Sequence, residues 1–333
     1  MINGPYNVFL FWNESFENIP LIHKMNINNI RNRLKNTHWN VILTSLDKGD
    51  EFYIEKIIDL PNYFFEMHKK HSSFESIPGN QSDIVRLRLL EKYGGVYFDV
   101  STILLRNNID DICLYKKFIE EDACIAGYTN FTFTRKNQYG DDFFQEGKDG
   151  IELGILYAKK NTKILKIINK EIDSYWNWKD KNKDYKDYPL FKKYNLTAVS
   201  FLNEYHVHYS IFHLVVTRNN SLLDSISVQS IHMKGKENSV TDGPYAITDR
   251  FCRGESSYDS ADPRKLFNAF LDGVLRTNEL HDTNLKDRIK LFSKMDLIVI
   301  PGYMRVFIEK ESQLFNEFFL TNPCYDFFYN ISR

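Results

Sequence analysis

Cysteine is scarce in this chain of 333 residues, with only four present and no C-x-x-C pair among them. Cysteines scattered in this way do not supply the paired ligands of a cysteine-based zinc site. Disulfides between them stay open, but free, buried thiols in a reducing compartment are the expectation. The four residues are Cys113, Cys124, Cys252 and Cys324.

The sequence also lacks a long apolar run and an excess of basic residues. No stretch reaches the ~18 apolar residues of a membrane-spanning helix, and the apolar segment near the N-terminus is short and has no basic leader. We therefore expect no transmembrane segment, no secretory signal and a cytoplasmic location, with peripheral membrane association left open. The formal net charge is -1, whereas proteins that wrap nucleic acid usually carry a basic excess, so no nucleic acid partner is expected.

The N-terminal region predicts a β-α-β arrangement without the glycine-rich turn of a dinucleotide-binding fold. Residues 7–12 and 39–46 have the apolar pattern of buried strands, and residues 22–34 between them have helical apolar spacing. This order is typical of a mainly parallel sheet in an α/β protein. Because no G-x-G-x-x-G follows the first strand, a nicotinamide-dependent dehydrogenase is disfavoured.

Apolar and aromatic residues, by contrast, are abundant. Hydrophobic residues make up 43% of the chain and aromatic residues 15%, with 26 Phe and 20 Tyr. That composition supports a large core, in one large α/β domain or in two domains. Most of the rings belong to the core, and a few exposed in a cleft would offer flat faces to sugars and bases.

The rest of the chain is predicted to alternate helices and strands. Further strands are expected at residues 96–100, 151–158, 227–233 and 296–301, and helices at 51–60, 62–70, 82–93, 162–175, 264–280, 286–295 and 304–320. Residues 235–262 show no clear periodicity, and a loop of that length is often functional. We expect it to close over a ligand as a lid.

Residues 82–101 form the most informative segment. Ser82 is suited to cap a helix and Gly94 to end it. The strand that follows delivers Asp99 at its carboxyl end, where open α/β sheets bind ligands. Asp83 and Arg86 are three residues apart and project from one helical face. We expect the double-glycine turn to bring that face toward the strand end, so that two carboxylates and a guanidinium converge.

Each of these residues, taken alone, also has a purely structural explanation. Asp83 would complement the helix dipole, an effect worth about 0.3–1 kcal/mol. Arg86 would form a surface salt bridge with Asp83 or Glu91, and Asp99 would cap a turn. Together and at this spacing they favour a site instead. Carboxylates bind hydroxyls or a divalent metal, and arginine binds hydroxyl or phosphate oxygens.

The segment resembles the sugar-binding region of glycosyltransferases that carry a D-x-D motif. The most similar types are the capsular-polysaccharide-synthesis and α-mannosyltransferase-like families, and the clostridial glucosylating toxins share the block. Their pattern reads S-D-(I/L)-x-R-x-x-x-L-x-x-x-G-G-(V/I)-(Y/W)-x-D-x-(D/T/S). The matching residues are Ser82, Asp83, Arg86, Leu90, Gly94, Gly95, Val96, Tyr97 and Asp99.

This resemblance implies a GT-A fold, a Rossmann-like sandwich that binds a nucleotide sugar, as residues 1–235, followed by a loop and a helical C-terminal extension at 236–333. It also implies a UDP- or GDP-sugar donor, Mn²⁺ or Mg²⁺, and a glycan acceptor. The donor-binding residues would be Trp12, Asp83, Arg86, Gly95, Tyr97, Asp99 and Lys234. Trp12 is equally well explained as a core residue, and Asp47, after the second strand, as a turn cap.

Metal binding would fall to Asp99, Ser101 and His232. Ser101 departs from the pattern, because a hydroxyl stands at the second acidic position and is a weaker metal ligand than a carboxylate. A non-catalytic carbohydrate-binding protein on a degenerate fold therefore stays open.

On the acceptor side, Glu152 is preferred to Asp141 and Asp142, which read more readily as a solvated turn. With Asp83, Arg86 and Asp99, Glu152 completes the predicted catalytic set. The resemblance further implies retention of anomeric configuration and a role in surface-polysaccharide synthesis. An effector that glycosylates a host protein would carry the same donor segment and stays open too.

Overall fold

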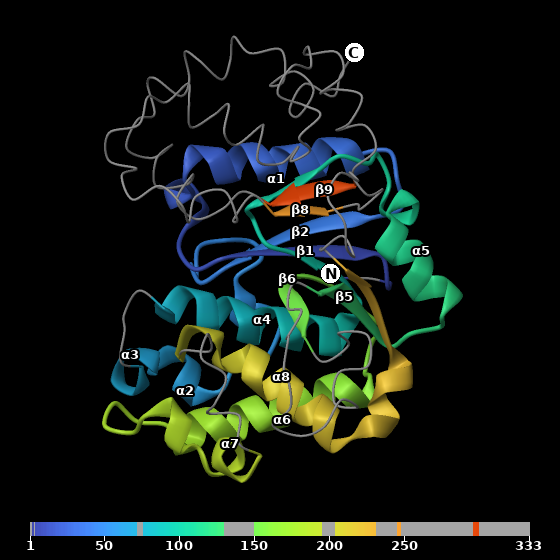
Figure 1. The fold of residues 1–333 in the computed structure, drawn as a ribbon. Coiled ribbons are helices and arrows are strands. Elements are labelled where there is room, and N and C mark those ends of the chain that lie inside the picture. The colour runs from blue at the N-terminus through green and yellow to red at the C-terminus, as the bar shows by residue number, and fades with distance from the viewer. Residues whose placement is uncertain are drawn as a thin grey trace, which may run out of the picture. The chain divides into compact units, whose positions relative to one another are not determined.

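The computed structural model describes residues 2, 4–71, 76–129, 150–194, 204–230, 245–247 and 296–299 (Figure 1). The chain divides into two compact units that interleave in sequence. The first comprises residues 1–18, 40–98 and 117–229, and the second comprises residues 19–39, 99–116 and the described residues from 230 on. The predicted domain boundary at 235 lies outside the described residues and stays a prediction.

The first unit is built on a six-stranded sheet of order β2-β1-β3-β6-β5-β7. Its strands are β1 (Asn7–Trp12), β2 (Asn40–Ser45), β3 (Gly95–Phe98), β5 (Ile125–Thr129), β6 (Ile151–Ala158) and β7 (Ile226–Ser230). β1 runs parallel to β2 and β3, whereas β6 runs antiparallel to β3 and β5. The predicted α/β class is confirmed, but the sheet is mixed rather than mainly parallel.

Helices pack on this sheet in layers. α4 (Ile77–Tyr93) lies against β1, β3 and β6, and α6 (Lys163–Trp178) packs on α4 and on α8 (Val207–Arg218) (Figure 1). The shorter elements are η1 (Phe16–Asn18), η2 (Ile54–Lys56), α2 (Asn62–Phe65), α3 (Met67–Lys70), α5 (Cys113–Glu120), η6 (Tyr185–Asp187), α7 (Pro189–Lys193), η8 (Glu204–His206) and η9 (Asn220–Ser225). The prediction of a helix over 51–60 is therefore wrong, and 62–70 holds two short helices instead of one.

The helix of the informative segment begins earlier than the sequence pattern predicts. α4 starts at Ile77, and a proline lies in its first turn, where its missing N–H removes no hydrogen bond. Ser82 is therefore inside the helix, not at its cap, and Asp83 is beyond the first turn. The predicted end is confirmed, because Gly94 follows the last helical residue with φ +68°.

The backbone conformation of the turn after α4 requires its two glycines. Both have positive φ, +68° at Gly94 and +101° at Gly95. A Cβ on Gly95 would lie 2.4 Å from the carbonyl oxygen of Asn7, and a Cβ on Gly94 would lie 2.7 Å from the amide nitrogen of Lys160. The turn thus lets β3 approach β1 closely, which accounts for Gly95 without a ligand.

The second unit contains α1 (Leu21–Leu34), η4 (Ile109–Asp111) and a three-stranded sheet of order β4-β9-β8. The strands are β4 (Thr102–Leu104), β8 (Tyr245–Ile247) and β9 (Leu297–Val299). β9 confirms the strand predicted near residue 298. The helices predicted beyond residue 263 lie outside the described residues, as does the predicted lid, apart from β8.

Buried polar side chains attach α1 to the turn that follows β3. His23 Nδ1 lies 3.2 Å from the carbonyl oxygen of Val100, and Asn26 Nδ2 donates to the same oxygen at 3.0 Å. Asn29 Oδ1 accepts from the amide of Leu104 at 2.8 Å. These contacts satisfy backbone groups that would otherwise be buried without partners.

The two cysteines within the described ranges are free, as expected, but they are not buried. Cys113 is exposed and Cys124 is partly exposed. Partial desolvation of the thiol and the charge of the neighbouring Asp296 raise the pKa of Cys113, so that it stays a thiol at neutral pH. None of the helices in the described part of the chain is long and apolar enough to cross a bilayer.

Candidate functional site

An ion pair on α4 forms the centre of the candidate site. Arg86 Nη1 lies 3.0 Å from Asp83 Oδ1, which confirms that the two side chains share one helical face. Only 9% of the Asp83 side chain and 4% of the Arg86 side chain are exposed. Two charges removed from water to this degree cost free energy unless they are paired and hydrogen-bonded.

The guanidinium of Arg86 is fixed on a second side as well. Its Nη2 donates to Ser82 Oγ at 2.9 Å, and Ser82 Oγ is 2.9 Å from the hydroxyl of Tyr97. The guanidinium carbon lies 4.6 Å from the centre of the Tyr97 ring, in cation–π contact. Tyr97 itself has no exposed surface. Tyr97 thus packs against the guanidinium of Arg86 and helps to fix it, and its predicted contact with the donor stays a prediction.

His208 on α8 holds the other oxygen of Asp83. The His208 Nδ1 atom is 3.0 Å from Asp83 Oδ2, and Trp176 Nε1 donates to His208 Nε2 at 2.9 Å. Because an indole N–H can only donate, Nε2 must accept, and the proton of a neutral imidazole must be on Nδ1. The geometry therefore assigns a neutral His208 that donates to Asp83.

Glu152 joins this cluster through the next residue of α8. The hydroxyl of Tyr209 donates to Glu152 Oε1 at 2.7 Å, and the amide of Gly154 donates to the same oxygen at 3.2 Å. Burial raises the pKa of Tyr209 well above its usual range, and the charges of Glu152 and Asp83 add to the shift while Arg86 opposes it. The phenol thus stays protonated and donates its hydrogen bond in the field of Glu152 and Asp83.

Three parallel strands end at the same edge of the sheet. Trp12 ends β1 opposite Ser45 at the end of β2, and Asp99 follows directly after Phe98, the last residue of β3. Trp12 is partly exposed at this edge. Its predicted role at the donor stays a prediction, and so does the structural alternative. Asp47 accepts from the amide of Gly49 at 2.8 Å, which confirms it as a turn cap.

The turn that carries Asp99 and Ser101 belongs to the second unit. The amide of Thr102 donates to the carbonyl of Asp99 at 2.9 Å, and α1 holds the carbonyl of Val100 between them. Asp99 is partly exposed and Ser101 is buried. The predicted convergence of Asp99 with Asp83 and Arg86 stays a prediction. His232, Lys234, Asp141 and Asp142 lie outside the described residues.

Metal binding at Asp99 has to be judged by the chemistry of its donor set. Within the described ranges, no three His, Cys, Asp or Glu side chains are grouped to hold a metal ion. Mg²⁺ in phosphate-transfer sites is typically held by one or two carboxylates, with substrate phosphates and water completing its shell. Asp99 supplies one partly exposed carboxylate at a strand end, which is the kind of ligand such an ion uses, whereas the hydroxyl of Ser101 is buried. The predicted metal site stays a prediction.

The sequence pattern does not reveal His208, Tyr209 or Trp176. α8 has no counterpart among the predicted elements, and His208 is 125 residues from Asp83 along the chain. Three histidines within residues 206–213 are the one sequence feature that would have drawn attention to this helix.

Residues 2–234 match the sequence model of the family described as capsular polysaccharide synthesis protein. Because the match covers well over half of the chain and includes the whole segment 82–101, the chain belongs to this family. The predicted family is thereby confirmed.

Individual relatives are more distant. The O-glycosyltransferase braB of Annulohypoxylon truncatum is 26% identical over 195 residues, which is 57% of this chain and 42% of that protein. The O-glycosyltransferase PaGT of Phomopsis amygdali is 30% identical over 106 residues, which is 32% of this chain and 26% of that protein. The chain therefore spans less than half the length of these curated relatives. Among solved structures, the PaToxG glycosyltransferase is 16% identical, with a TM-score of 0.32 over 65% of this chain and 78% of that one.

Proposed function

We propose that this protein is a glycosyltransferase that moves a sugar from a nucleotide-sugar donor to a hydroxyl acceptor. The observation that carries the proposal is the desolvated Asp83–Arg86 pair. A buried ion pair is weak evidence for a contribution to stability, so its presence calls for another reason. A fixed carboxylate beside a fixed guanidinium offers acceptors and donors to neighbouring sugar hydroxyls. Membership of the capsular polysaccharide synthesis family supports this interpretation.

In the proposed site, Asp83 and Arg86 bind hydroxyls of the donor sugar, and Trp12 lies near the nucleotide of a UDP- or GDP-sugar. Lys234 binds the diphosphate. Asp99, with Ser101 and His232, holds Mn²⁺ or Mg²⁺. When bound, such an ion neutralises negative charge that develops on the departing diphosphate.

Glu152 is proposed to serve the acceptor side. In the transfer, the acceptor oxygen bonds to the anomeric carbon while the bond from that carbon to the diphosphate oxygen breaks, and its electron pair leaves with the nucleoside diphosphate. The proton of the acceptor hydroxyl passes to Glu152 or to the leaving diphosphate. Attack on the face that the diphosphate leaves would retain the anomeric configuration. The proposed context is synthesis of a capsule or another surface polysaccharide.

The test is nucleotide release from a panel of UDP-glucose, UDP-galactose, UDP-N-acetylglucosamine and GDP-mannose with MnCl₂. Asp83→Asn should lower the release by about 10²- to 10³-fold, the usual effect of removing a group that stabilises the transition state. Asp173→Asn is the matched control, because Asp173 on α6 pairs with Arg88 of α4, the helix that also carries Asp83, at 2.5 Å, but 37% of the Asp173 side chain is exposed. Its activity should stay at the wild-type level.

Two other outcomes discriminate the alternatives. Binding of a nucleotide sugar without any release would favour the non-catalytic carbohydrate-binding protein, which the hydroxyl at Ser101 suggests. Neither binding nor release with any member of the panel would contradict the proposal. Release with transfer to a protein acceptor, but to no glycan, would identify an effector that modifies a host protein.

A further inference from the structure

Two consecutive residues of α8 contact two of the three carboxylates predicted for the site. His208 donates to Asp83 on α4, and Tyr209 donates to Glu152 on β6. Successive residues of an α-helix point about 100° apart, so one turn of α8 reaches both elements. We propose that His208 and Tyr209 are positioning residues that fix Asp83 and Glu152 for donor and acceptor. This inference rests on the proposed glycosyltransferase function.

The bond from His208 to Asp83 is held in one direction by Trp176. The indole of Trp176 is fully buried in α6 and donates to Nε2, which leaves only Nδ1 to carry the proton of the neutral ring. Asp83 therefore always faces a donor and has one oxygen directed to Arg86 and the other to His208. A carboxylate held at both oxygens keeps a single rotamer, which is what binding of a sugar hydroxyl requires.

The bond from Tyr209 to Glu152 is equally constrained. Burial and the two nearby carboxylates raise the pKa of Tyr209, so its hydroxyl remains a donor across the physiological range. The amide of Gly154 adds a second bond to Oε1 of Glu152. Both bonds fall on one oxygen and fix the orientation of the carboxylate on the strand.

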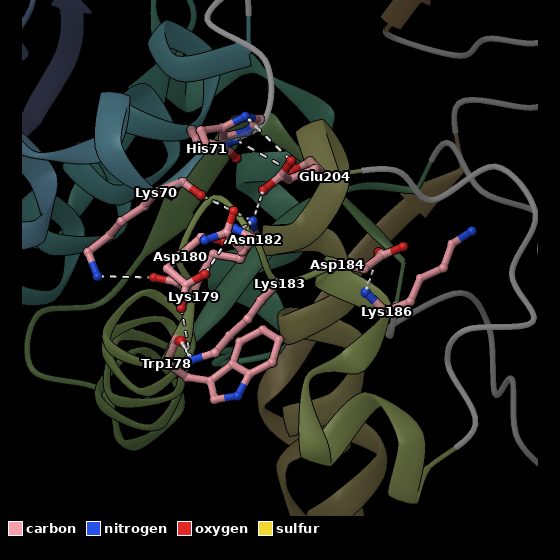
Figure 2. Close-up of polar contacts among 11 residues, drawn as sticks. Lys70, His71, Trp178, Lys179, Asp180, Asn182, Lys183, Asp184, Lys186 and Glu204 are labelled. Atoms are coloured by element: carbon pink, nitrogen blue, oxygen red, sulfur yellow. Dashed lines mark hydrogen bonds and ion pairs between the residues drawn. The ribbon is translucent and has the colours of Figure 1, made fainter.

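A buried cluster anchors the start of α8 (Figure 2). Glu204 opens η8, which runs directly into α8. Lys179 is 1% exposed, and its Nζ lies 2.8 Å from Glu204 Oε1 in an ion pair. The same ammonium donates to the carbonyl of Lys70 at 3.1 Å and to the carbonyl of Asp180 at 2.8 Å. His71 Nδ1 is 3.6 Å from the other oxygen of Glu204.

This buried cluster is connected to the positioning residue His208. Glu204 and His208 are four residues apart, and the rings of His71 and His208 lie 5.9 and 6.0 Å from the ring of Trp176. Asn80 on α4 donates to His71 Nε2 at 2.9 Å. The start of α8 is thus tied to α4 and α6, the helices that carry Asp83 and Trp176.

Four variants test the inference in the full chain. His208→Phe removes the donor to Asp83, whereas His208→Asn keeps an N–H close to the place of Nδ1. Tyr209→Phe removes the donor to Glu152. Tyr188→Phe is its matched control, because the hydroxyl of Tyr188 donates to Glu171 at 2.6 Å, outside the candidate site. kcat and KM are measured for the four nucleotide sugars with MnCl₂, and Tm reports folding.

His208→Phe should raise the donor KM by about 10- to 100-fold, the usual range for residues that orient binding groups. His208→Asn should restore KM to within about threefold of wild type, a rescue that a purely structural role would not give. Tyr209→Phe should lower kcat by about tenfold or more, and Tyr188→Phe should change neither value. Folded His208→Phe and Tyr209→Phe with wild-type kcat and KM would overturn the inference and leave the proposed function standing.

A wild-type protein without turnover would overturn the proposed function, and a second readout then decides the positioning claim. Long-range ¹H–¹⁵N spectra of ¹⁵N-histidine-labelled protein should show one ring protonated at Nδ1 whose signals disappear in His208→Asn. Signals of an Nε2-protonated or doubly protonated ring at this position would overturn the inference independently of activity.

Discussion

Two buried clusters with nearly the same chemistry each bring a histidine ring into contact with Trp176. In one, Asp83 pairs with Arg86 at 3.0 Å and faces His208, and in the other Glu204 pairs with Lys179 at 2.8 Å and faces His71. In each, the histidine accepts a hydrogen bond at Nε2, from Trp176 or from Asn80, at 2.9 Å in both cases. In each cluster, therefore, the Nδ1 atom of a neutral imidazole faces a carboxylate whose negative charge is balanced by a nearby cation.

The clusters differ in the cation and in what surrounds it. The ammonium of Lys179 donates to two backbone carbonyls and forms an ion pair with Glu204, so it connects three segments of the chain. Arg86 is instead bound to side chains of its own helix and lies over the ring of Tyr97. We infer that the Lys179 cluster serves stability and that the Arg86 cluster serves ligand binding.

Replacing Arg86 by lysine and Lys179 by arginine should give the largest difference in effect between the two clusters. Arg86→Lys keeps the charge beside Asp83 but loses the planar fork of donors and the stacking on Tyr97, and these properties are not interchangeable between arginine and lysine. We expect kcat/KM for the best donor to fall by about 10²-fold with little change in Tm. Steady-state kinetics and a thermal melt of the same preparation measure both.

Lys179→Arg is the reciprocal exchange and serves as the control. A larger guanidinium in this closed site should lower the free energy of unfolding by about 1–3 kcal/mol through overpacking. Its kcat/KM should remain within about threefold of wild type. The division of roles would be contradicted if Lys179→Arg lost as much activity as Arg86→Lys.

Lys179→Met should have the largest effect on stability. Removing the cation leaves the Glu204 carboxylate buried beside a histidine that stays neutral, and breaking a buried pair in this way costs about 3–5 kcal/mol. Chemical denaturation measures this loss. The double variant Lys179→Met with Glu204→Leu should be more stable than Lys179→Met alone, because the buried charge is gone. A double variant that is no more stable than Lys179→Met would contradict this account.

Mild acid should have the smallest effect. Burial lowers the pKa of His71, the charge of Glu204 opposes this shift, and the charge of Lys179 adds to it. Burial also lowers the pKa of His206, and the charge of Asp83 opposes that shift. Unfolded histidine titrates near pH 6.5, so below that pH the unfolded chain binds protons that the folded chain does not. The free energy of unfolding should therefore stay level above about pH 6.5 and fall below it, by at most about 1.4 kcal/mol per pH unit for each histidine.

Denaturant unfolding at pH 7.5 and 5.5 checks this dependence. His71→Gln should have a shallower loss of stability between the two values than wild type. An identical loss in both proteins would show that His71 does not contribute.

Local patterns were sufficient to predict the segment that carries the motif. The end of α4 at Gly94, the strand after it and the shared face of Asp83 and Arg86 all follow from spacing within a few residues, and the structure confirms them. The pattern does not predict the true start of α4. The helix includes a proline in its first turn, whereas the pattern places the boundary at Ser82, which resembles a capping residue.

Long-range pairing could not be predicted in the same way. The antiparallel direction of β6 depends on which strands it meets, and its apolar run reads the same in either direction. Likewise, Asp83 meets His208 and Glu152 meets Tyr209 only because α8 packs on α6 and β6. A single sequence has no spacing rule for such contacts, although the histidines of residues 206–213 mark the helix that makes them.

A crystal structure with a bound nucleotide sugar would test the central claim most directly. The account predicts that hydroxyls of the sugar lie within hydrogen-bonding distance of Asp83 and Arg86, while His208 still contacts Asp83 and the Lys179–Glu204 pair is unchanged. A sugar bound elsewhere on the protein, with Asp83 and Arg86 still contacting only protein groups, would contradict it.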